Sequence, residues 1–211
     1  MQLTIFGATG MVGQHIVKQA LWAGYNVIAF GRNANVFYAD EPKNLTAFKG
    51  YLTDVAQIEK AIQGSQAVIS AIGSNISTDA TDNTRSLGMK NIVTAMQNSG
   101  LTKIAAIGGM GILPSQEPAS LIYETEHFPQ QLIPVTLEHL KAFEYLKASN
   151  LAYSFFCPPT ITNAICNGNY TVAHNAVANN IMHVTAGNLA DAMLKAIAHD
   201  NEVGLYGIND K

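Results

Sequence analysis

The stretch TIFGATGMVGQHIV, residues 4–17, sets three glycines at intervals of three between a short apolar run and a helical pattern. The N-terminus of a helix leaves unpaired N–H groups, and the helix dipole adds positive potential there. A phosphate binds such a site when the backbone can approach it closely, which a side chain at the contact point would prevent. Gly7, Gly10 and Gly13 suit the turn, the ligand contact and the helix–strand contact, and we expect Thr9 and Met11 to border the same ligand.

The context of these glycines matters more than their number. Their spacing is GxxGxxG, whereas the commonest dinucleotide fingerprint is GxGxxG. The motif nevertheless follows a predicted strand, opens a predicted helix and lies within a βαβ unit, as a dinucleotide site requires. The alternative is a glycine-rich turn that binds no ligand.

The end of the second predicted strand bears on which dinucleotide would bind. An NAD site usually places Asp or Glu about 20 residues after the glycines, where it bonds the ribose hydroxyls. The sequence here, residues 26–36, is NVIAFGRNANV, with Arg32 in that region and no carboxylate. A guanidinium can bind a 2′-phosphate with two hydrogen bonds, so we expect NADP(H) in preference to NAD(H). The alternative is that Arg32 is a solvated loop residue.

Composition narrows the class of protein. The chain has 211 residues, which we interpret as one domain spanning 1–211, with 48% apolar and 13% charged residues. A net charge of −3 without a run of Lys or Arg argues against nucleic acid or an anionic membrane as partner. We read no membrane span and no secretory signal, and Cys157 and Cys166 look like reduced thiols, so we expect a cytoplasmic protein.

Two periodicities alternate along the chain. Short apolar runs predict strands, several of them buried on both faces, and amphipathic runs between them predict helices. The order predicts an α/β fold with a mostly parallel sheet and helices on both faces. The predicted strands are 3–6, 26–30, 45–48, 67–71, 103–107, 152–156, 169–174 and 204–208, and the predicted helices are 11–23, 55–63, 84–99, 135–148 and 187–199.

One connection is unusually long. Residues 108–134 contain three glycines and four prolines between a predicted central strand and the next helix. A connection of this length in a compact domain is usually functional, so we expect a lid over the site; the alternative is a surface excursion.

Further segments carry a family resemblance. They are VISAIGS (68–74), NIVTAMQNSGLTKIAAIG (91–108), LKASNLAYSFFCPPTIT (146–162) and NGNYTV (167–172). With the GATGxxG turn, they make the chain resemble an atypical short-chain dehydrogenase/reductase of the NmrA-like and biliverdin-IXβ/flavin reductase branch. The resemblance implies a single Rossmann-type domain, a three-layer αβα sandwich with a small C-terminal substrate region. It also implies NAD(P) across the carboxyl ends of the strands. It places Gly73 and Ser74 near the cofactor ribose, and Pro158, Pro159 and Thr160 near the nicotinamide.

The chain departs from its relatives where they transfer protons. Many relatives use a YxxxK pair, and no YxxxK occurs here. Aligned through LKASNLAYS, the Tyr position is Val135, the Lys position is His139, and the serine after the fifth strand falls at Gly109. The histidine that follows the paired prolines in flavin reductases is Thr160, and the usual Asp after the third strand is Tyr51.

Hydride transfer can survive without that pair, because the cofactor supplies the chemistry. A flavin, quinone or similar planar acceptor can take its proton from water. His139 is the remaining candidate for an acid or base, although a histidine packed against the sheet is the more frequent finding. Tyr123, in the predicted lid, is a weaker candidate. No metal-ligand spacing and no GxSxG elbow occur, so we expect neither a metal site nor a serine hydrolase.

Two functions from different classes follow. The first is an NAD(P)H-dependent oxidoreductase acting on a small planar acceptor, as a monomer or homodimer. The second is a non-catalytic NADP(H)-binding redox sensor of the NmrA-like type. The missing YxxxK favours the second, and the compact length favours the first.

Overall fold

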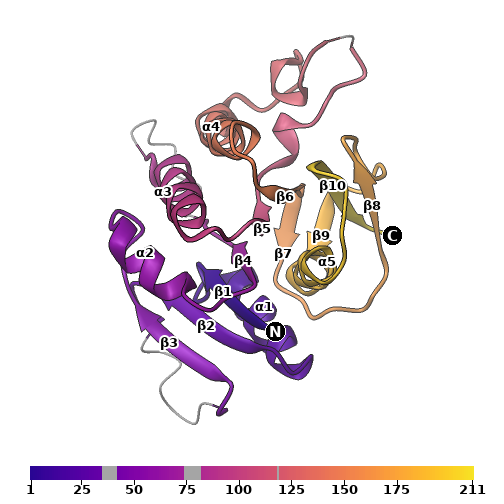
Figure 1. Ribbon diagram of the computed structural model, residues 1–211. Helices are drawn as coiled ribbons and strands as arrows, with labels where there is room; N and C mark the ends of the chain where they lie inside the picture. Colours follow the sequence, from indigo (N-terminus) through magenta and orange to yellow (C-terminus); the bar gives the residue numbers. More distant parts are fainter. Residues whose placement is uncertain (35–41, 74–81, 118) are drawn as a thin grey trace.

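A computed structural model describes residues 1–34, 42–73, 82–117 and 119–211 (Figure 1). Its main sheet has eight strands in the order β3-β2-β1-β4-β5-β6-β10-β8, and β8 alone runs antiparallel, against β10. The strands of this sheet are β1 (Gln2–Phe6), β2 (Asn26–Gly31), β3 (Leu45–Lys49), β4 (Ala67–Ser70), β5 (Lys103–Ile107), β6 (Ala152–Cys157), β8 (Tyr170–His174) and β10 (Gly204–Asp210).

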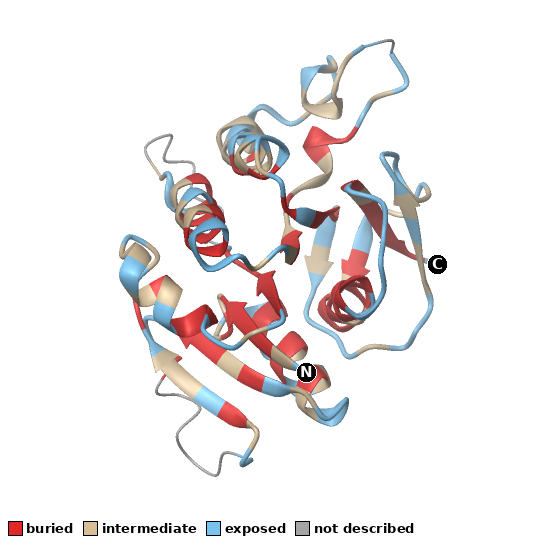
Figure 2. Ribbon diagram, in the orientation of Figure 1, coloured by how far each residue is buried: buried red, intermediate tan, exposed pale blue. Residues whose placement is uncertain are grey.

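Helices cover both faces of the sheet, which confirms the predicted three-layer α/β architecture (Figures 1 and 2). The first core cluster lies under α1 and α5, and the second lies under α2, α3 and α4. The helices are α1 (Met11–Trp22), α2 (Val55–Ile62), α3 (Thr84–Ser99), α4 (Ile133–Lys147) and α5 (Ala186–Ala198). No helix in the described parts of the chain combines the length and apolar character needed to span a bilayer.

Strand β1 shows why the sheet needs both helical layers. Leu3 and Ile5 join the cluster under α1 and α5, whereas Phe6 joins the opposite cluster. Thr4 points to the α2 side, where its buried hydroxyl donates a hydrogen bond of 2.7 Å to the carbonyl of Ala61. Successive side chains of a strand face opposite sides of the sheet, so an almost continuously apolar strand must be covered twice.

Most predicted elements are present within one or two residues of their expected bounds. Gly100 ends α3 with φ of 73°, the left-handed conformation that glycine adopts without strain. Helix α4 begins two residues earlier than predicted, because Pro134 fits the first turn, where no N–H is needed. The sequence did not reveal β7 (Thr160–Thr162) and β9 (His183–Thr185), which pair in a separate small sheet.

The connection from 108 to 134 is more structured than an open loop. It carries three short 3₁₀ turns, at Met110–Ile112, Ile122–Glu124 and Gln130–Leu132. Its base is anchored by the buried side chains of Ile112 and Leu113, and its outer part is largely exposed (Figure 2). The N–H of Ile122 donates to the carbonyl of Leu113 at 3.0 Å, which closes the segment on itself. Its action as a lid stays a prediction.

Asn188 holds the C-terminal region together. Its side chain is fully buried near the start of α5, and its oxygen accepts hydrogen bonds of 3.0 and 3.1 Å from the N–H groups of Asn167 and Gly168. Its amide nitrogen donates to Asp210, at the end of β10, at 2.8 Å. Asp210 also accepts from the N–H of Thr185, so one amide links three separate segments.

Replacing Asn188 with Ala should lower the free energy of unfolding by about 3 kcal/mol, because buried donors and acceptors lose their partners. The matched control is Asn98→Ala on α3, where an exposed amide donates to Glu59 at 2.7 Å; that change should stay within about 0.5 kcal/mol. Urea unfolding measures both values. Equal losses of unfolding free energy for the two variants would contradict the role of Asn188 in linking the three segments.

Candidate cofactor-binding site

Gly7 and Gly13 are required by the packing of the protein itself. Gly7 has φ of +75°, and a Cβ there would lie 2.4 Å from the carbonyl oxygen of Ala71. A Cβ on Gly13 would lie 2.1 Å from the carbonyl oxygen of Gly7. Helix α1 therefore approaches the end of β1 so closely that no side chain fits between them. These are the turn and helix–strand contacts that the sequence predicted for these two residues.

Gly10 differs from Gly7 and Gly13, because its backbone conformation does not require glycine and a Cβ there would make one slightly tight contact in place of an overlap. Its φ of −74° and ψ of 169° are open to any residue. A Cβ would meet the carbonyl of Gly7 at 3.3 Å and no other described atom within 4 Å, and the residue is exposed. The bare backbone therefore leaves space on the outer side of the turn, where a ligand would approach.

The N-terminus of α1 has the features of an anion-binding site. Among the described residues, no side chain caps this helix, and its first turn carries no acidic residue. Asp54 caps α2 and Thr185 caps α5, whereas the cap residues of α3 and α4, like that of α1, make no such bond. Thr9 and Met11 flank the turn: the carbonyl of Thr9 accepts from the Gln14 amide at 2.9 Å, and Met11 is exposed. The free N–H groups and the dipole suit a diphosphate.

The ends of β2 and β4, next to the start of α1, are also uncrowded among the described residues. A Cβ on Gly31 would come no nearer than 3.7 Å to Thr9, and a Cβ on Gly73 would meet nothing within 4 Å in the described part of the chain. Arg32 follows Gly31 and is exposed, as a residue that contacts a surface phosphate would be. Ser74, predicted beside Gly73, lies outside the described residues. Gly10, Gly31 and Gly73 thus form a glycine-lined edge with room for an extended ligand.

Pro158 and Thr160 lie just beyond β6, on the other side of the switch in strand order. Pro158 is buried, and its carbonyl accepts from the N–H of Met110 at 3.0 Å. Thr160 is exposed and begins β7, with its N–H directed to the carbonyl of Met182 at 3.3 Å. The backbone of this segment is therefore fixed, and the Thr160 side chain is accessible.

His139 lies against Gly109. A Cβ on Gly109 would be 3.1 Å from Cδ2 of the His139 ring, so the positions that carry serine and lysine in many relatives are in contact here. Burial, and secondly the positive charge of Arg85, lower the pKa of the His139 imidazole to about 3. The ring is neutral near pH 7, so it can donate or accept a hydrogen bond but is both a weak base and no source of an imidazolium proton.

Arg85 is a buried charged residue beside His139 that the sequence did not reveal. This arginine lies in the first turn of α3 and is only 7% exposed. Its pKa is lowered by burial, while Asp82 and Glu138 act in the opposite direction. Glu138, on α4, also accepts from Ser86 at 3.1 Å and so ties the two helices together. A charged residue on the buried face of a predicted helix was the available signal.

Among the described residues, no contact joins Tyr123 to the glycine edge. It lies on the 3₁₀ turn Ile122–Glu124, and its hydroxyl donates to Glu124 at 3.2 Å. Burial and the neighbouring Glu124 carboxylate raise its pKa, which makes it a weaker acid than a free tyrosine. Val135, at the tyrosine position of relatives, offers no proton at all.

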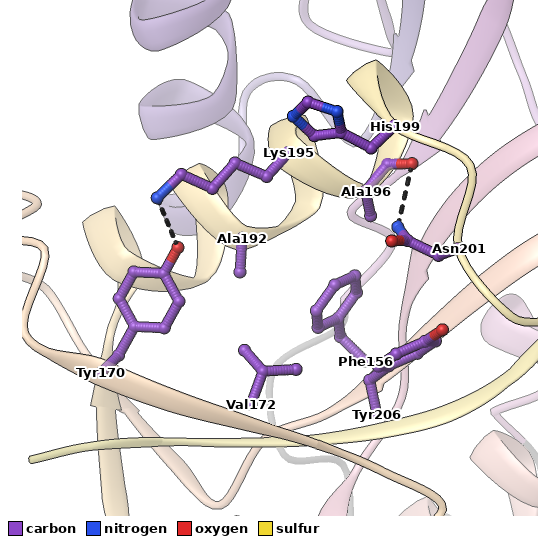
Figure 3. Close-up of a pocket in the computed structure, with 9 residues that line it drawn as sticks. All are labelled: Phe156, Tyr170, Val172, Ala192, Lys195, Ala196, His199, Asn201 and Tyr206. Atoms are coloured by element: carbon purple, nitrogen blue, oxygen red, sulfur yellow. Dashed lines mark hydrogen bonds between the residues drawn. The ribbon is translucent and has the colours of Figure 1, made fainter.

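A pocket of about 170 Å³ lies elsewhere, between α5 and strands β6, β8 and β10 (Figure 3). Its polar groups satisfy one another: Lys195 donates to Tyr170 at 3.1 Å, and the Tyr170 hydroxyl donates to Asp191 at 2.6 Å. The pocket is smaller than usual ligand sites. Across the described ranges, no three His, Cys, Asp or Glu side chains come together to hold a metal ion.

Comparison with known proteins agrees with this geometry. A family model described as NAD(P)H-binding matches residues 7–200. The uncharacterised protein YwnB of Bacillus subtilis is 23% identical over 218 residues, which is 94% of this chain and 93% of the relative.

Two solved structures show the same fold. One is a candidate NADH-flavin reductase of Streptococcus pneumoniae, 22% identical, with a TM-score of 0.82 and 100% of both chains covered. The other is a short-chain dehydrogenase/reductase of Veillonella parvula in complex with NADP, 18% identical, with a TM-score of 0.78 over 99% of this chain and 94% of the other. The chain therefore belongs to the NAD(P)H-binding family, and it has the Rossmann-type fold of these solved structures.

Proposed function

We propose that the protein is an NADPH-dependent reductase of a flavin, quinone or similar planar acceptor. The observation that carries the proposal is the row of glycines at the carboxyl edge of the sheet. Among the described residues, a Cβ on Gly31 or Gly73 would not be crowded, and one on Gly10 would meet only the Gly7 carbonyl oxygen, at 3.3 Å. These bare backbones therefore leave room for an extended dinucleotide. Ligands of open α/β sheets bind at this edge, where the strand order reverses between β1 and β4.

Each part of the edge has a separate task in this proposal. The N-terminus of α1 holds the diphosphate, and the Arg32 guanidinium binds the 2′-phosphate that distinguishes NADPH from NADH. Pro158 and Thr160 border the nicotinamide on its far side. When bound, the cofactor supplies a hydride, and the protein contributes position and the exclusion of water.

The proposed reaction does not need a proton donor from this chain. A flavin or quinone that accepts a hydride takes its proton from solvent, so no strong acid is needed. We propose that His139, neutral against Gly109, donates or accepts a hydrogen bond to the acceptor and orients it. This role suits a ring whose pKa is lowered to about 3 better than general acid catalysis would.

A second function is a non-catalytic NADP(H)-binding sensor. The observation that favours it is the replacement of the usual Tyr and Lys by Val135 and a neutral His139. Such a protein would bind the same cofactor and transfer no hydride.

Turnover separates the two functions. Purified protein with NADPH and FMN, dichlorophenolindophenol or a simple quinone should oxidise NADPH steadily. His139→Gln should lower kcat about tenfold and leave the KM for NADPH unchanged. Because His139 stays neutral well above its pKa of about 3, the rate should show no inflection from this group between about pH 5 and 8. Tight NADPH binding without turnover on the whole panel would support the sensor instead.

Two glycine variants test the site against the fold. Gly10→Val should leave the thermal unfolding temperature of the free protein within a few degrees and abolish NADPH binding in calorimetry, because its side chain fills the ligand space. Gly13→Val should destabilise the protein severely, because its Cβ would overlap the Gly7 carbonyl. If Gly10→Val kept full affinity, the diphosphate would not lie at this turn.

Arg32→Ala tests the choice of cofactor. Removal of a bidentate guanidinium should weaken NADPH about thirtyfold, in line with about 2 kcal/mol for a charge-assisted contact, and change NADH affinity less than threefold. Titration of both nucleotides on one protein preparation gives the ratio directly. Equal losses for NADPH and NADH would refute the 2′-phosphate role.

A further inference from the structure

Tyr51 and Arg32 leave the sheet side by side. Strands β2 and β3 are parallel, with Gly31 opposite Lys49, and the N–H of Gly50 donates to the carbonyl of Gly31 at 3.3 Å. Arg32 is the next residue after Gly31, and Tyr51 is the next after Gly50. Adjacent strands lie about 5 Å apart, so both residues start from the same edge. Both are exposed.

The backbone that carries Tyr51 is firmly held. A Cβ on Gly50 would lie 2.4 Å from the Phe30 ring, so this glycine is pressed against the core. The N–H of Tyr51 donates to the Gln57 side chain at 2.9 Å. The Tyr51 ring is nevertheless 49% exposed, and its hydroxyl makes no hydrogen bond to any residue that the structure describes. The backbone of Tyr51 is therefore firmly held, and its hydroxyl has no hydrogen-bond partner among the described residues.

The position of this ring identifies its ligand. If the diphosphate lies at α1 and the phosphorylated ribose at Arg32, the adenosine half continues outward from β1 across β2 toward β3. The base then reaches the end of β3, where Tyr51 stands. A carboxylate at that place could accept a hydrogen bond from the adenine amino group. A phenol ring offers a flat apolar face instead.

We propose that Tyr51 stacks on the adenine ring, so that the base is held by its face and not by its 6-amino group. The inference rests on the proposed binding of NADPH at the glycine edge. Stacking between a base and an aromatic side chain is tolerant of base identity, because every base has a π-face. The site therefore accepts a dinucleotide that carries hypoxanthine in place of adenine.

The test is a set of calorimetric titrations with NADPH and with its deaminated, hypoxanthine analogue. The wild-type protein should bind the two within threefold. Tyr51→Ala should weaken both about tenfold, as the loss of one stacking contact predicts, whereas Tyr51→Phe should stay within twofold. Trp22→Ala is the matched control, because Trp22 is 78% exposed at the distant end of α1 and should leave both affinities unchanged. Circular dichroism confirms that each variant is folded.

The titrations distinguish a failure of the Tyr51 stacking role from a failure of the proposed cofactor site. If wild-type protein binds NADPH and Tyr51→Ala binds it equally well, the stacking role is wrong and the proposed cofactor site stands. A preference of more than thirtyfold for NADPH over the hypoxanthine analogue would show that the amino group is read, and would also overturn the inference. If wild-type protein binds neither nucleotide, the cofactor site itself is wrong.

Discussion

Helix α1 and strand β1 meet at a distance that only glycine permits. The place of a Cβ on Gly13 is 2.1 Å from the carbonyl oxygen of Gly7, and Gly7 itself needs a positive φ and lies against the backbone at Ala71. This contact directs the start of α1 to the carboxyl edge of the sheet, beside the point where strand order reverses. The open N–H groups, the unobstructed Gly10 and the adjoining ends of β2 and β4 all depend on that one approach.

The two halves of the glycine edge differ in how firmly their backbone is held and in the acid–base groups that they carry. The half over β1, β2 and β3 is rigid, because Gly50 is locked against Phe30 and the backbone of Tyr51 is tied to α2 through Gln57. The half over β5 and β6 lacks the acid–base pair of many relatives, and a half-buried, neutral His139 lies against Gly109 in its place. A reaction that draws its proton from water fits such an edge, and so does a sensor that performs no reaction.

Much of this arrangement could be predicted from the sequence, because alternating periodicities and punctuating glycines act locally. The parallel sheet, five helices and the roles of Gly7 and Gly13 in packing followed from pattern alone. Strands β7 and β9 did not, since three residues carry no periodicity and their pairing joins segments 23 positions apart. Nor could local sequence show that Arg85 is buried or that His139 is neutral, because both properties arise where α3, α4 and the end of β5 come together.

A crystal structure of the protein grown with NADP⁺ would show directly whether the dinucleotide binds along the glycine edge. The account predicts electron density for the diphosphate against the main chain at Gly10, with the 2′-phosphate beside Arg32 and the nicotinamide near Pro158 and Thr160. Density for the nucleotide anywhere else, such as the pocket beside Lys195, would contradict it. So would an empty glycine edge at a nucleotide concentration that saturates other members of the family.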